Sequence, residues 1–244
     1  MTFNHSLSAK VERCSLREPD SDGDTRLEGN LVVKTNNDQV LEFFITQQVL
    51  RGSDGAILSS SRDEIEDSLE AGEELSIDLD SGYFKASAFG DSSKANIYIE
   101  VLGCKADYAQ LPSVNLGDGD PGLYGWNHAI HLGSDVIIES LSAGVKPIDD
   151  DGEVCVELRA LVYNSSKRQV PRFVLKARAI AEGGREIDDQ STDEAIAPGE
   201  RKLVEFSFHP IKAYRMKGLS IAIDATSFTI QGKANTNSEI DVTH

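Results

Sequence analysis

Cysteine and long apolar runs are scarce in this chain. Its 244 residues include three cysteines, Cys14, Cys104 and Cys155, which lie far apart and form no Cys-x-x-Cys pair. This spacing predicts reduced thiols and therefore a cytoplasmic protein. There is no run of about 18 apolar residues, and the N-terminus has no charged segment followed by an apolar core. We therefore expect neither a membrane span nor a secretory signal.

Positive charge is also scarce. The sequence has 24 Lys and Arg residues against 41 Asp and Glu residues, which gives a formal net charge of −17. Such a surface repels nucleic-acid phosphates and anionic lipids, so we expect neither nucleic acid nor a membrane surface as a partner. The same field attracts cations or a basic protein.

Catalytic signatures are absent as well. The sequence contains no G-x-S-x-G elbow, no glycine-rich phosphate loop after a strand and no H-E-x-x-H pair. Because Cys104 lies beside Lys105, a reactive thiol is one interpretation of this cysteine. The other is packing, which is the usual role of a cysteine at the end of a strand. The prediction is a protein that is not an enzyme and that has no cofactor and no metal centre.

What the chain does contain is an internal repeat. Residues 34–57 resemble residues 162–187, with Phe43 matched to Phe173 and Ile45 to Leu175. Further blocks match in the same order along the two copies. Residues 11–16, upstream, match 136–141; downstream, residues 71–80 match 198–208 and residues 96–101 match 220–225. Several matched blocks in one order predict a tandem duplication.

Each copy shows the two-residue period of β-strands. Apolar and polar residues alternate, and turn-forming residues such as Asn36 and Asn164 separate the alternating segments. Ile65 and Leu69, four residues apart, allow at most one short helical crossing. We predict an all-β fold of two tandem immunoglobulin-like β-sandwich domains, with the first copy burying Leu31, Val33, Phe43, Ile45, Leu75, Ile77 and Ile99. The expected parts are a domain at 1–115, a Gly/aromatic connecting segment at 116–132 and a domain at 133–244.

The second copy resembles a known family. Its pattern of turn, alternating strand and Pro-Gly-Glu turn is similar to the FxLYD-type and related immunoglobulin-like modules of bacterial proteins. The residues that carry the likeness are Asn164, Val170, Phe173, Leu175, Ala177, Ile187, Pro198, Gly199 and Glu200. The first copy departs from the pattern by having Ala71 in place of the proline. The resemblance implies an immunoglobulin-like sandwich and no shared enzyme activity.

Two acidic loops are the first candidate sites. Residues 19–24 include Asp20, Asp22 and Asp24, and residues 147–153 include Asp149, Asp150, Asp151 and Glu153. Carboxylate oxygens are ligands that calcium prefers, but neither loop has the spacing of a helix–loop–helix calcium site. Solvated turns are the alternative interpretation.

The segment between the copies is a second candidate. It contains Tyr124, Trp126, His128 and His131 among several glycines. Exposed aromatic residues among glycines are typical of contact surfaces. Two alternatives remain open: the aromatic residues wedge between the two sandwiches, or His128 and His131 supply half of a zinc site that lacks further ligands.

A basic stripe is the third candidate. Arg168, Arg172, Lys176 and Arg178 occur in the second copy and have no basic counterparts in the first. They predict either a surface that docks an acidic partner or an exposed strand face whose charge discourages edge pairing.

These observations favour a non-catalytic protein-interaction or assembly module that binds another protein or itself. The alternative is a ligand-binding β-sandwich that recognises a carbohydrate or calcium through the Trp126 segment or the acidic loops. A hydrolase with a site shared by both copies is a third and weaker hypothesis.

Overall fold

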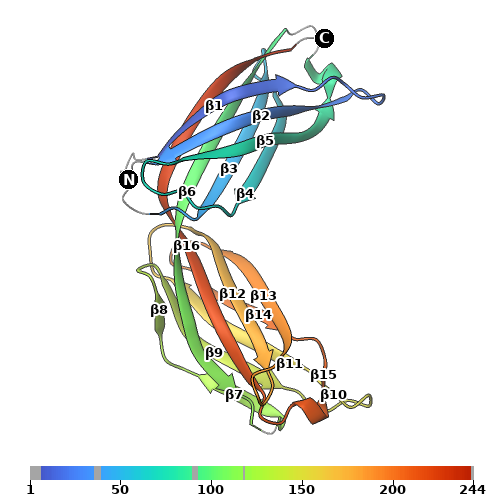
Figure 1. The fold of residues 1–244 in the computed structure, drawn as a ribbon, viewed down its shortest axis with the longest axis vertical. Coiled ribbons are helices and arrows are strands. Elements are labelled where there is room, and N and C mark those ends of the chain that lie inside the picture. The colour runs from blue at the N-terminus through green and yellow to red at the C-terminus, as the bar shows by residue number, and fades with distance from the viewer. Residues whose placement is uncertain (1–6, 36–39, 90–92, 118, 243–244) are drawn as a thin grey trace. The chain divides into compact units, whose positions relative to one another are not determined.

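The chain folds almost entirely into β-strands. The computed structural model describes residues 7–35, 40–89, 93–117 and 119–242, so the turn expected at Asn36 lies outside the described residues. The strands are β1 (Leu7–Leu16), β2 (Asp24–Thr35), β3 (Phe43–Gly52), β4 (Ile57–Ile65), β5 (Glu74–Lys85), β6 (Lys94–Asn115), β7 (Gly122–Trp126), β8 (Ile130–Leu132), β9 (Val136–Val145), β10 (Glu153–Val154), β11 (Val156–Asn164), β12 (Val170–Ile180), β13 (Glu186–Ile196), β14 (Arg201–Ser207), β15 (Ile211–Lys212) and β16 (Ser220–Asp241). Two short 3₁₀ helices, η1 (Ala86–Phe89) and η2 (Ala213–Arg215), complete the fold (Figure 1). The predicted all-β class is confirmed.

The chain divides into two compact units. The first consists of residues 1–105 together with 230–244, and the second consists of residues 106–229. The sequence-based division places residues 133–244 in the second domain, whereas the structure returns residues 230–244 to the first unit.

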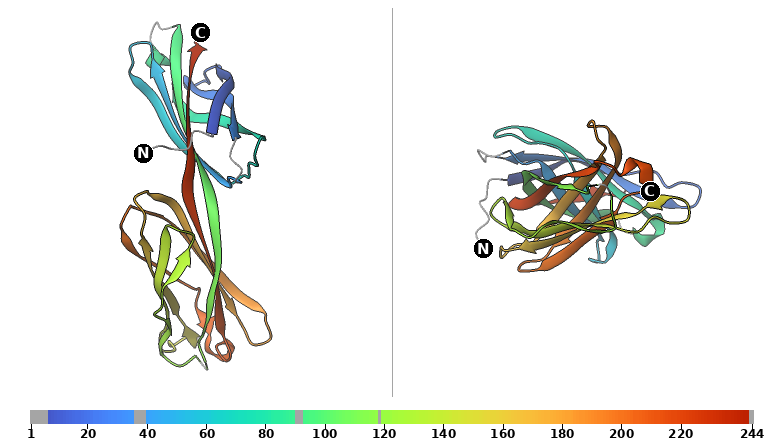
Figure 2. Two further views of the ribbon diagram at one scale, coloured as in Figure 1. Left: turned by 90° about the vertical axis from the view of Figure 1, so that its left-hand side faces the viewer. Right: turned by 90° about the horizontal axis from the view of Figure 1, so that it is seen from below.

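Strand length explains this difference. Strands β6 and β16 contain 22 residues each, while strands of globular sheets usually contain about 3–10 residues. Each of these strands therefore continues from one unit into the other, as the green and red strands of Figure 2 show.

The first unit has two facing groups of strands. One sheet has the order β1-β2-β5, and its partner contains β4, β3 and β6 in the order β4-β3-β6. Apolar residues that alternate along these strands meet between the two layers, as expected of a sandwich. The fully buried members of this core include Leu27, Leu31, Val33, Leu41, Phe44, Ile97, Ile99 and Val101.

The second unit repeats this strand order. Its first sheet has the order β14-β11-β9-β7, with β8 also paired to β9, and its second contains β13-β12-β16. The strands β9, β11 and β14 thus follow one another as β1, β2 and β5 do, and β12, β13 and β16 are arranged as β3, β4 and β6 are. The fully buried core residues include Val136, Ile138, Val156, Leu158, Phe173, Leu175, Ile221 and Ile223.

The hairpin between β3 and β4 recurs between β12 and β13. In the first, the Gly52 N–H donates to the Ala56 carbonyl and the Gly55 N–H donates to the Gly52 carbonyl, both at 2.9 Å. In the second, Ala181 and Arg185 form the equivalent 2.9 Å bond, and Gly184 donates back to Ala181 at 3.0 Å. This geometry aligns Gly52 with Ala181.

The recurring hairpin corrects the predicted inward face of β3. With Gly52 aligned to Ala181, Phe44 rather than Phe43 corresponds to Phe173. Phe44 and Leu50 belong to the core of the first unit, while Phe43 and Ile45 are buried outside that core, on the opposite side of the strand. A shift of one residue reverses every side chain of a strand.

The predicted helical crossing is also absent from the described residues around Ile65. Residues 57–65 form β4, and Leu69 pairs with Leu41 in an isolated bridge instead. Because both backbone hydrogen bonds of this bridge are made, at 2.8 and 3.1 Å, the segment after β4 follows the sheet rather than a helix.

The face assignment of β3 can be tested with two neighbouring residues. Leu50 is 1% exposed within the core, so Leu50→Ala should lower the free energy of unfolding by about 2–5 kcal/mol. Val49 lies on the other face, and Val49→Ala should cost about 1 kcal/mol or less. Urea unfolding of both variants compares them. A larger loss for Val49→Ala would contradict the assigned face.

Candidate functional site

The first acidic loop is closed by its own hydrogen bonds and by a lysine. The carboxylate of Asp20 accepts hydrogen bonds from the backbone N–H groups of Asp22 and Asp24, each at 2.9 Å. The Lys85 ammonium lies 2.8 Å from the Asp24 carboxylate and donates to the Asp22 carbonyl at 2.9 Å. The positive charge of this loop is therefore supplied by the protein.

The second acidic loop repeats this arrangement. Asp149 accepts from the backbone N–H groups of Asp151 at 3.0 Å and Glu153 at 2.8 Å. The Lys212 ammonium lies 2.9 Å from the Glu153 carboxylate and donates to the Asp151 carbonyl at 3.2 Å. In both loops a lysine uses the carbonyl and carboxylate oxygens that a calcium ion would need.

The aromatic segment forms two strands of the second unit rather than a linker. Strand β7 pairs with β9, which places Tyr124 opposite Ala143 and Trp126 opposite Leu141. The Trp126 indole N–H donates to the Pro112 carbonyl of β6 at 3.3 Å, and the Tyr124 hydroxyl donates to the Asp120 carbonyl at 2.9 Å. Both rings are half-buried against the core of the second unit.

The two histidines of this segment are separated by that arrangement. The ring of His128 lies against Trp126, with ring centroids 4.8 Å apart. His131 is exposed in β8, opposite Ile137. Within the residues that the structure describes, no three His, Cys, Asp or Glu side chains are grouped to hold a metal ion.

Open hollows lie on both sides of β7. One, of about 360 Å³, is lined by Ser113, Val114, Asn115 and residues 123–126. The other, of about 140 Å³, is lined by residues 123–127 with Leu141 and Ser142. Gly125 has a φ of 143°, and a Cβ there would lie 2.1 Å from the Leu141 carbonyl oxygen. Only glycine allows β7 to approach β9 this closely.

The basic stripe is matched by acidic residues on neighbouring strands. Strand β12 lies between β13 and β16, so it is not an edge strand, and the interpretation based on edge protection is wrong. The ion pairs are Arg172–Asp193 at 2.6 Å, Lys176–Asp189 at 3.7 Å and Arg178–Asp224 at 2.9 Å. Three charges that were candidates for docking are thus paired within the sheet.

Arg168 lies apart from these three pairs, in the turn before β12. Its carbonyl accepts hydrogen bonds from the Asn164 amide at 2.7 Å and from the Ser166 hydroxyl at 2.9 Å. Asn164 is fully buried and also donates to the Ile196 carbonyl at 3.1 Å. The backbone of Arg168 therefore helps to fix the turn.

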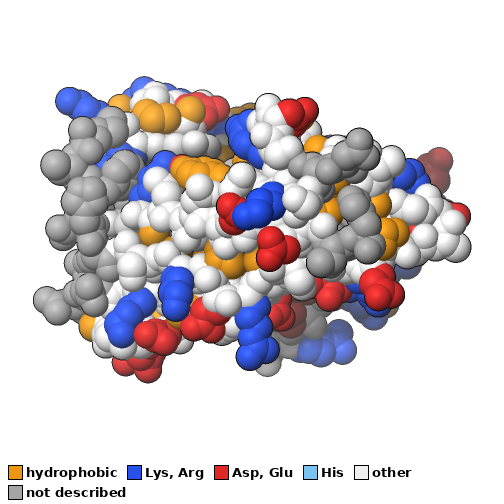
Figure 3. Space-filling view, turned by 90° about the horizontal axis from the view of Figure 1, so that it is seen from above, with side chains coloured by type: hydrophobic (Ala, Val, Ile, Leu, Met, Phe, Trp, Pro, Cys, Tyr) orange, Lys and Arg blue, Asp and Glu red, His pale blue; other side chains and the backbone are white. Residues whose placement is uncertain are grey.

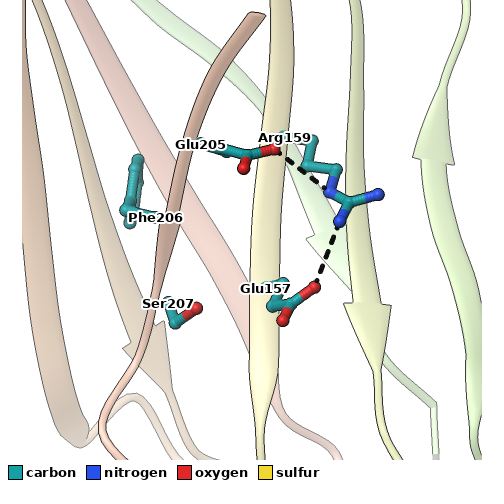
Figure 4. A pocket seen from close by; sticks show the side chains of 5 residues that line it. All are labelled: Glu157, Arg159, Glu205, Phe206 and Ser207. Atoms are coloured by element: carbon teal, nitrogen blue, oxygen red, sulfur yellow. Dashed lines mark hydrogen bonds and ion pairs between the residues drawn. The ribbon is translucent and has the colours of Figure 1, made fainter.

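A polar hollow on the outer face of β11 and β14 was not predicted. It has a volume of about 190 Å³ and is lined by Glu157, Arg159, Glu205, Phe206 and Ser207. Arg159 lies 3.4 Å from the Glu157 carboxylate and 3.5 Å from that of Glu205, and Figure 4 shows its guanidinium between them. Lys146 also pairs with Glu157, and its hydrogen bond lowers the pKa of that carboxyl group.

A second feature that the sequence did not reveal joins β13 to the end of β14. Asp188 accepts from the backbone N–H of His209 at 2.8 Å, and its carboxylate lies 3.1 Å from the His209 ring nitrogen. Gln190 donates to Asp188 at 3.4 Å. Partial burial acts to raise the pKa of Asp188, but these hydrogen bonds outweigh it and hold the pKa below its ordinary value. No short sequence spacing links residues this far apart.

The cysteines are free thiols. Cys104 is buried, and burial raises its pKa to about 12, while burial raises the pKa of Cys14 to about 11. A thiol with such a pKa forms little thiolate, which is the reactive form. Packing is therefore the better interpretation of Cys104.

Charges of both signs are mixed on the face seen in Figure 3, with apolar side chains between them. The net negative charge is therefore not gathered into one acidic patch on that face. No helix among residues 7–35, 40–89, 93–117 and 119–242 is long and apolar enough to cross a membrane.

No family model matches the sequence, and no curated protein is significantly similar to it. Many solved structures are similar at a low level, including the following three. Red sea bream transglutaminase is 10% identical with a TM-score of 0.24, covering 96% of this chain and 31% of its own. A protein named pT26-6p is 8% identical with a TM-score of 0.25, covering 94% and 66%. The sporulation control protein Spo0M from Bacillus subtilis is 9% identical with a TM-score of 0.26, covering 64% and 78%.

The chain thus spans about a third of the transglutaminase and about two thirds of pT26-6p. Identities and TM-scores this low assign no family and no activity. Membership of the FxLYD-type family stays a prediction, and the sandwich-like all-β fold is what the structure shows.

The ion pairs of β12 differ in burial, which allows a test. The Arg172 side chain is 16% exposed and that of Lys176 is 51% exposed. Arg172→Glu should lower the free energy of unfolding by about 2–4 kcal/mol, because it places two carboxylates together in a partly buried position. Lys176→Glu should cost about 1 kcal/mol or less. Equal losses in urea unfolding would contradict the assigned pairing.

The lowered pKa of Asp188 predicts a pH dependence. A carboxyl group whose folded pKa is depressed stabilises the fold above its unfolded pKa, and that contribution is lost as the pH falls through the folded value. At neutral pH, Asp188→Asn should cost about 1–2 kcal/mol, and the difference from the unaltered protein should begin to shrink below about pH 4 and disappear once the pH is below the folded pKa of Asp188. Asp189→Asn, at the adjacent exposed position, serves as control. Thermal unfolding across this pH range measures both, and a pH-independent loss would contradict the assignment.

Proposed function

We propose that the chain is a non-catalytic protein-interaction module that accepts an extended segment of a partner protein beside β7. The observation that carries this proposal is a difference between the units. In the described part of the first unit, the sheet β1-β2-β5 has no strand beyond β1, whereas the second unit adds β7 and β8 beyond β9. Strands present in one unit alone are where a function specific to that unit is expected.

Strand edges on both sides of the hollow support the proposal. β7 is the outer strand of its sheet, and the pairing of β6 with β3 ends at Cys104. The last residues of β6 therefore form a second outer edge, and three of them, Ser113, Val114 and Asn115, line the hollow. An extended peptide binds such edges through backbone hydrogen bonds and seats alternate side chains in adjacent hollows.

The edge also carries features that limit self-association. Pro112 has no N–H to donate, and its carbonyl is already engaged by Trp126. Proline and blocked backbone groups are common means of protecting an edge strand. Leu123, 74% exposed beside the hollow, remains as an apolar contact for a partner. The net charge of −17 favours a basic partner segment.

Fewer observations support the ligand-binding alternative. The hollows are open, and a lysine already occupies each acidic loop, so neither a carbohydrate nor a calcium ion has a specific observation in its favour at these places. A catalytic role has little support too, because Arg159 and the two glutamates of the hollow in Figure 4 satisfy one another as ion pairs.

We also infer that the units arose by duplication of one sandwich. The recurring strand order, the matching hairpins and the lysine-closed loops support this inference, as does a third repeated contact. The Glu73 carboxylate accepts from the Glu70 N–H at 3.2 Å, and the Glu200 carboxylate accepts from the Ala197 N–H at 2.7 Å. After such a duplication, one copy can gain additional strands such as β7 and β8 while the other copy keeps the original sandwich.

The proposal can be tested with two exposed leucines of the same sheet. Leu123 lies on β7 and Leu203, 55% exposed, lies on the opposite outer strand β14. Leu123→Asp should weaken binding of a protein captured from cell extract at least about tenfold, equivalent to about 1.4 kcal/mol. Leu203→Asp should leave binding unchanged. The dissociation constants are measured with the purified partner, and thermal unfolding confirms that both variants fold. Retained binding by Leu123→Asp would overturn the proposed surface.

A further inference from the structure

The core of the first unit contains a polar interruption. Along β3, Phe44 and Leu50 face the core, and the two positions between them on that face are Thr46 and Gln48, which are 0% and 2% exposed. With the hairpin alignment, the second unit has Leu175 and Ala177 at these places, both fully buried. Buried polar groups carry a desolvation cost unless they find partners.

Strand pairing brings two more polar side chains to the same place. Thr46 lies opposite Asp63 of β4, and Gln48 lies opposite Ser61. Side chains directly opposite one another in antiparallel strands have Cβ atoms about 4.5–5.5 Å apart. The Gln48 amide N–H donates to the Asp63 carboxylate at 2.8 Å. This hydrogen bond links the pair Thr46–Asp63 to the pair Gln48–Ser61, so the four residues form one cluster. We call Thr46, Gln48, Ser61 and Asp63 the oxygen cluster.

Three oxygens of the oxygen cluster have no protein partner. Thr46 Oγ1, Gln48 Oε1 and Ser61 Oγ are buried, and no hydrogen bond is formed to any of them among the described residues. Such atoms need an explanation, because nearly all buried polar groups are paired. Three of them on one face of adjacent strands point to a shared bound species.

The charge of the oxygen cluster is also unbalanced. Within the described parts of the chain, no lysine or arginine pairs with Asp63; the adjacent Arg62 pairs with Glu64 at 3.1 Å instead. Burial raises the pKa of Asp63, as does the nearby charge of Asp80, while the Gln48 hydrogen bond opposes them. A positive charge is what this carboxylate lacks.

We propose that Thr46, Gln48, Ser61 and Asp63 bind one hard cation of the size of Na⁺ or Ca²⁺. Carboxylate, amide and hydroxyl oxygens are ligands that such ions prefer, and water completes their coordination. Strand β4 is the outer strand of its sheet, so the oxygen cluster lies next to solvent at the side of the unit. The ion stabilises the first unit in proportion to its concentration relative to its dissociation constant.

Isothermal titration calorimetry of the full, EDTA-treated chain tests this proposal. The buffer contains choline chloride as its salt, and Na⁺, K⁺, Mg²⁺ and Ca²⁺ are added separately. We expect one equivalent of Na⁺ or Ca²⁺ to bind, and the midpoint of thermal unfolding to rise with that ion. Asp63→Asn keeps the shape of the side chain and should weaken binding at least about tenfold. Asp22→Asn, in the first acidic loop, should bind as the unaltered protein does.

Thr46→Val provides a readout that does not depend on Asp63. Without added cation it should raise the midpoint of thermal unfolding, because an unpaired buried hydroxyl is replaced by a methyl group of similar shape. It should also bind the ion several-fold more weakly. A lower midpoint for Thr46→Val without cation would overturn the proposal, since it would mean that the hydroxyl is already satisfied.

Other outcomes are equally decisive. No heat from any of the four ions at millimolar concentration, a preference for K⁺ or Mg²⁺, or loss of binding in Asp22→Asn alone would each overturn the proposal. If Asp63→Asn does not fold, a crystal grown with the ion that raises the unfolding midpoint decides. An ion about 2.3–2.6 Å from the oxygens of the cluster supports the site, and water at hydrogen-bond distances there overturns it.

Discussion

The backbone pairing of β6 and β16 is the constraint on which the rest of the structure depends. Each strand contains 22 residues and contributes to both units. The first part of β6 supplies Ile97 and Ile99 to the core of the first unit, and its last part supplies Leu111 and Val114 to the core of the second. The first unit is therefore built from two separate segments of the chain, and the second unit is the continuous segment between them. A change that shifted the register of either strand would reverse the faces that both cores use.

Much of this fold follows from local sequence. Alternating apolar residues and glycine-containing turns predict antiparallel strands, and the repeated blocks predict the shared strand order. The inward face of β3 could not be predicted in the same way, because Phe43, Phe44 and Ile45 are consecutive apolar residues and fit either face. The hairpin hydrogen bonds at Gly52 decide between them. The length of β6 escaped prediction because strand signals continue through residues 105–115 with no turn to mark the change of unit.

The sequence shows which residues of the candidate sites are unusual, but it does not show which contacts those residues make. The sequence marks Trp126 as unusual, but its contact with Pro112 depends on two strands meeting at one side of a sandwich. It also marks the basic stripe, whose partners lie 13 to 46 residues away along the chain; Lys176 meets Asp189, and Arg178 meets Asp224, through strand register alone. Charge patterns read from one strand therefore overestimate the free charge of a sheet face.

The two units use polar residues in opposite ways. In the second, charged residues stay on the outer face of β12, and each pairs with a neighbouring strand, so its core remains apolar around Leu175 and Ala177. In the first, β3 turns Thr46 and Gln48 into the core instead, where polar groups without partners are destabilising. The second unit has the same strand order and places Leu175 and Ala177 at the corresponding positions, although its Ser227 hydroxyl is also buried without a partner among the described residues. Polar residues at these two positions of β3 are therefore not required by the fold, and a bound species at the oxygen cluster is what would offset their cost.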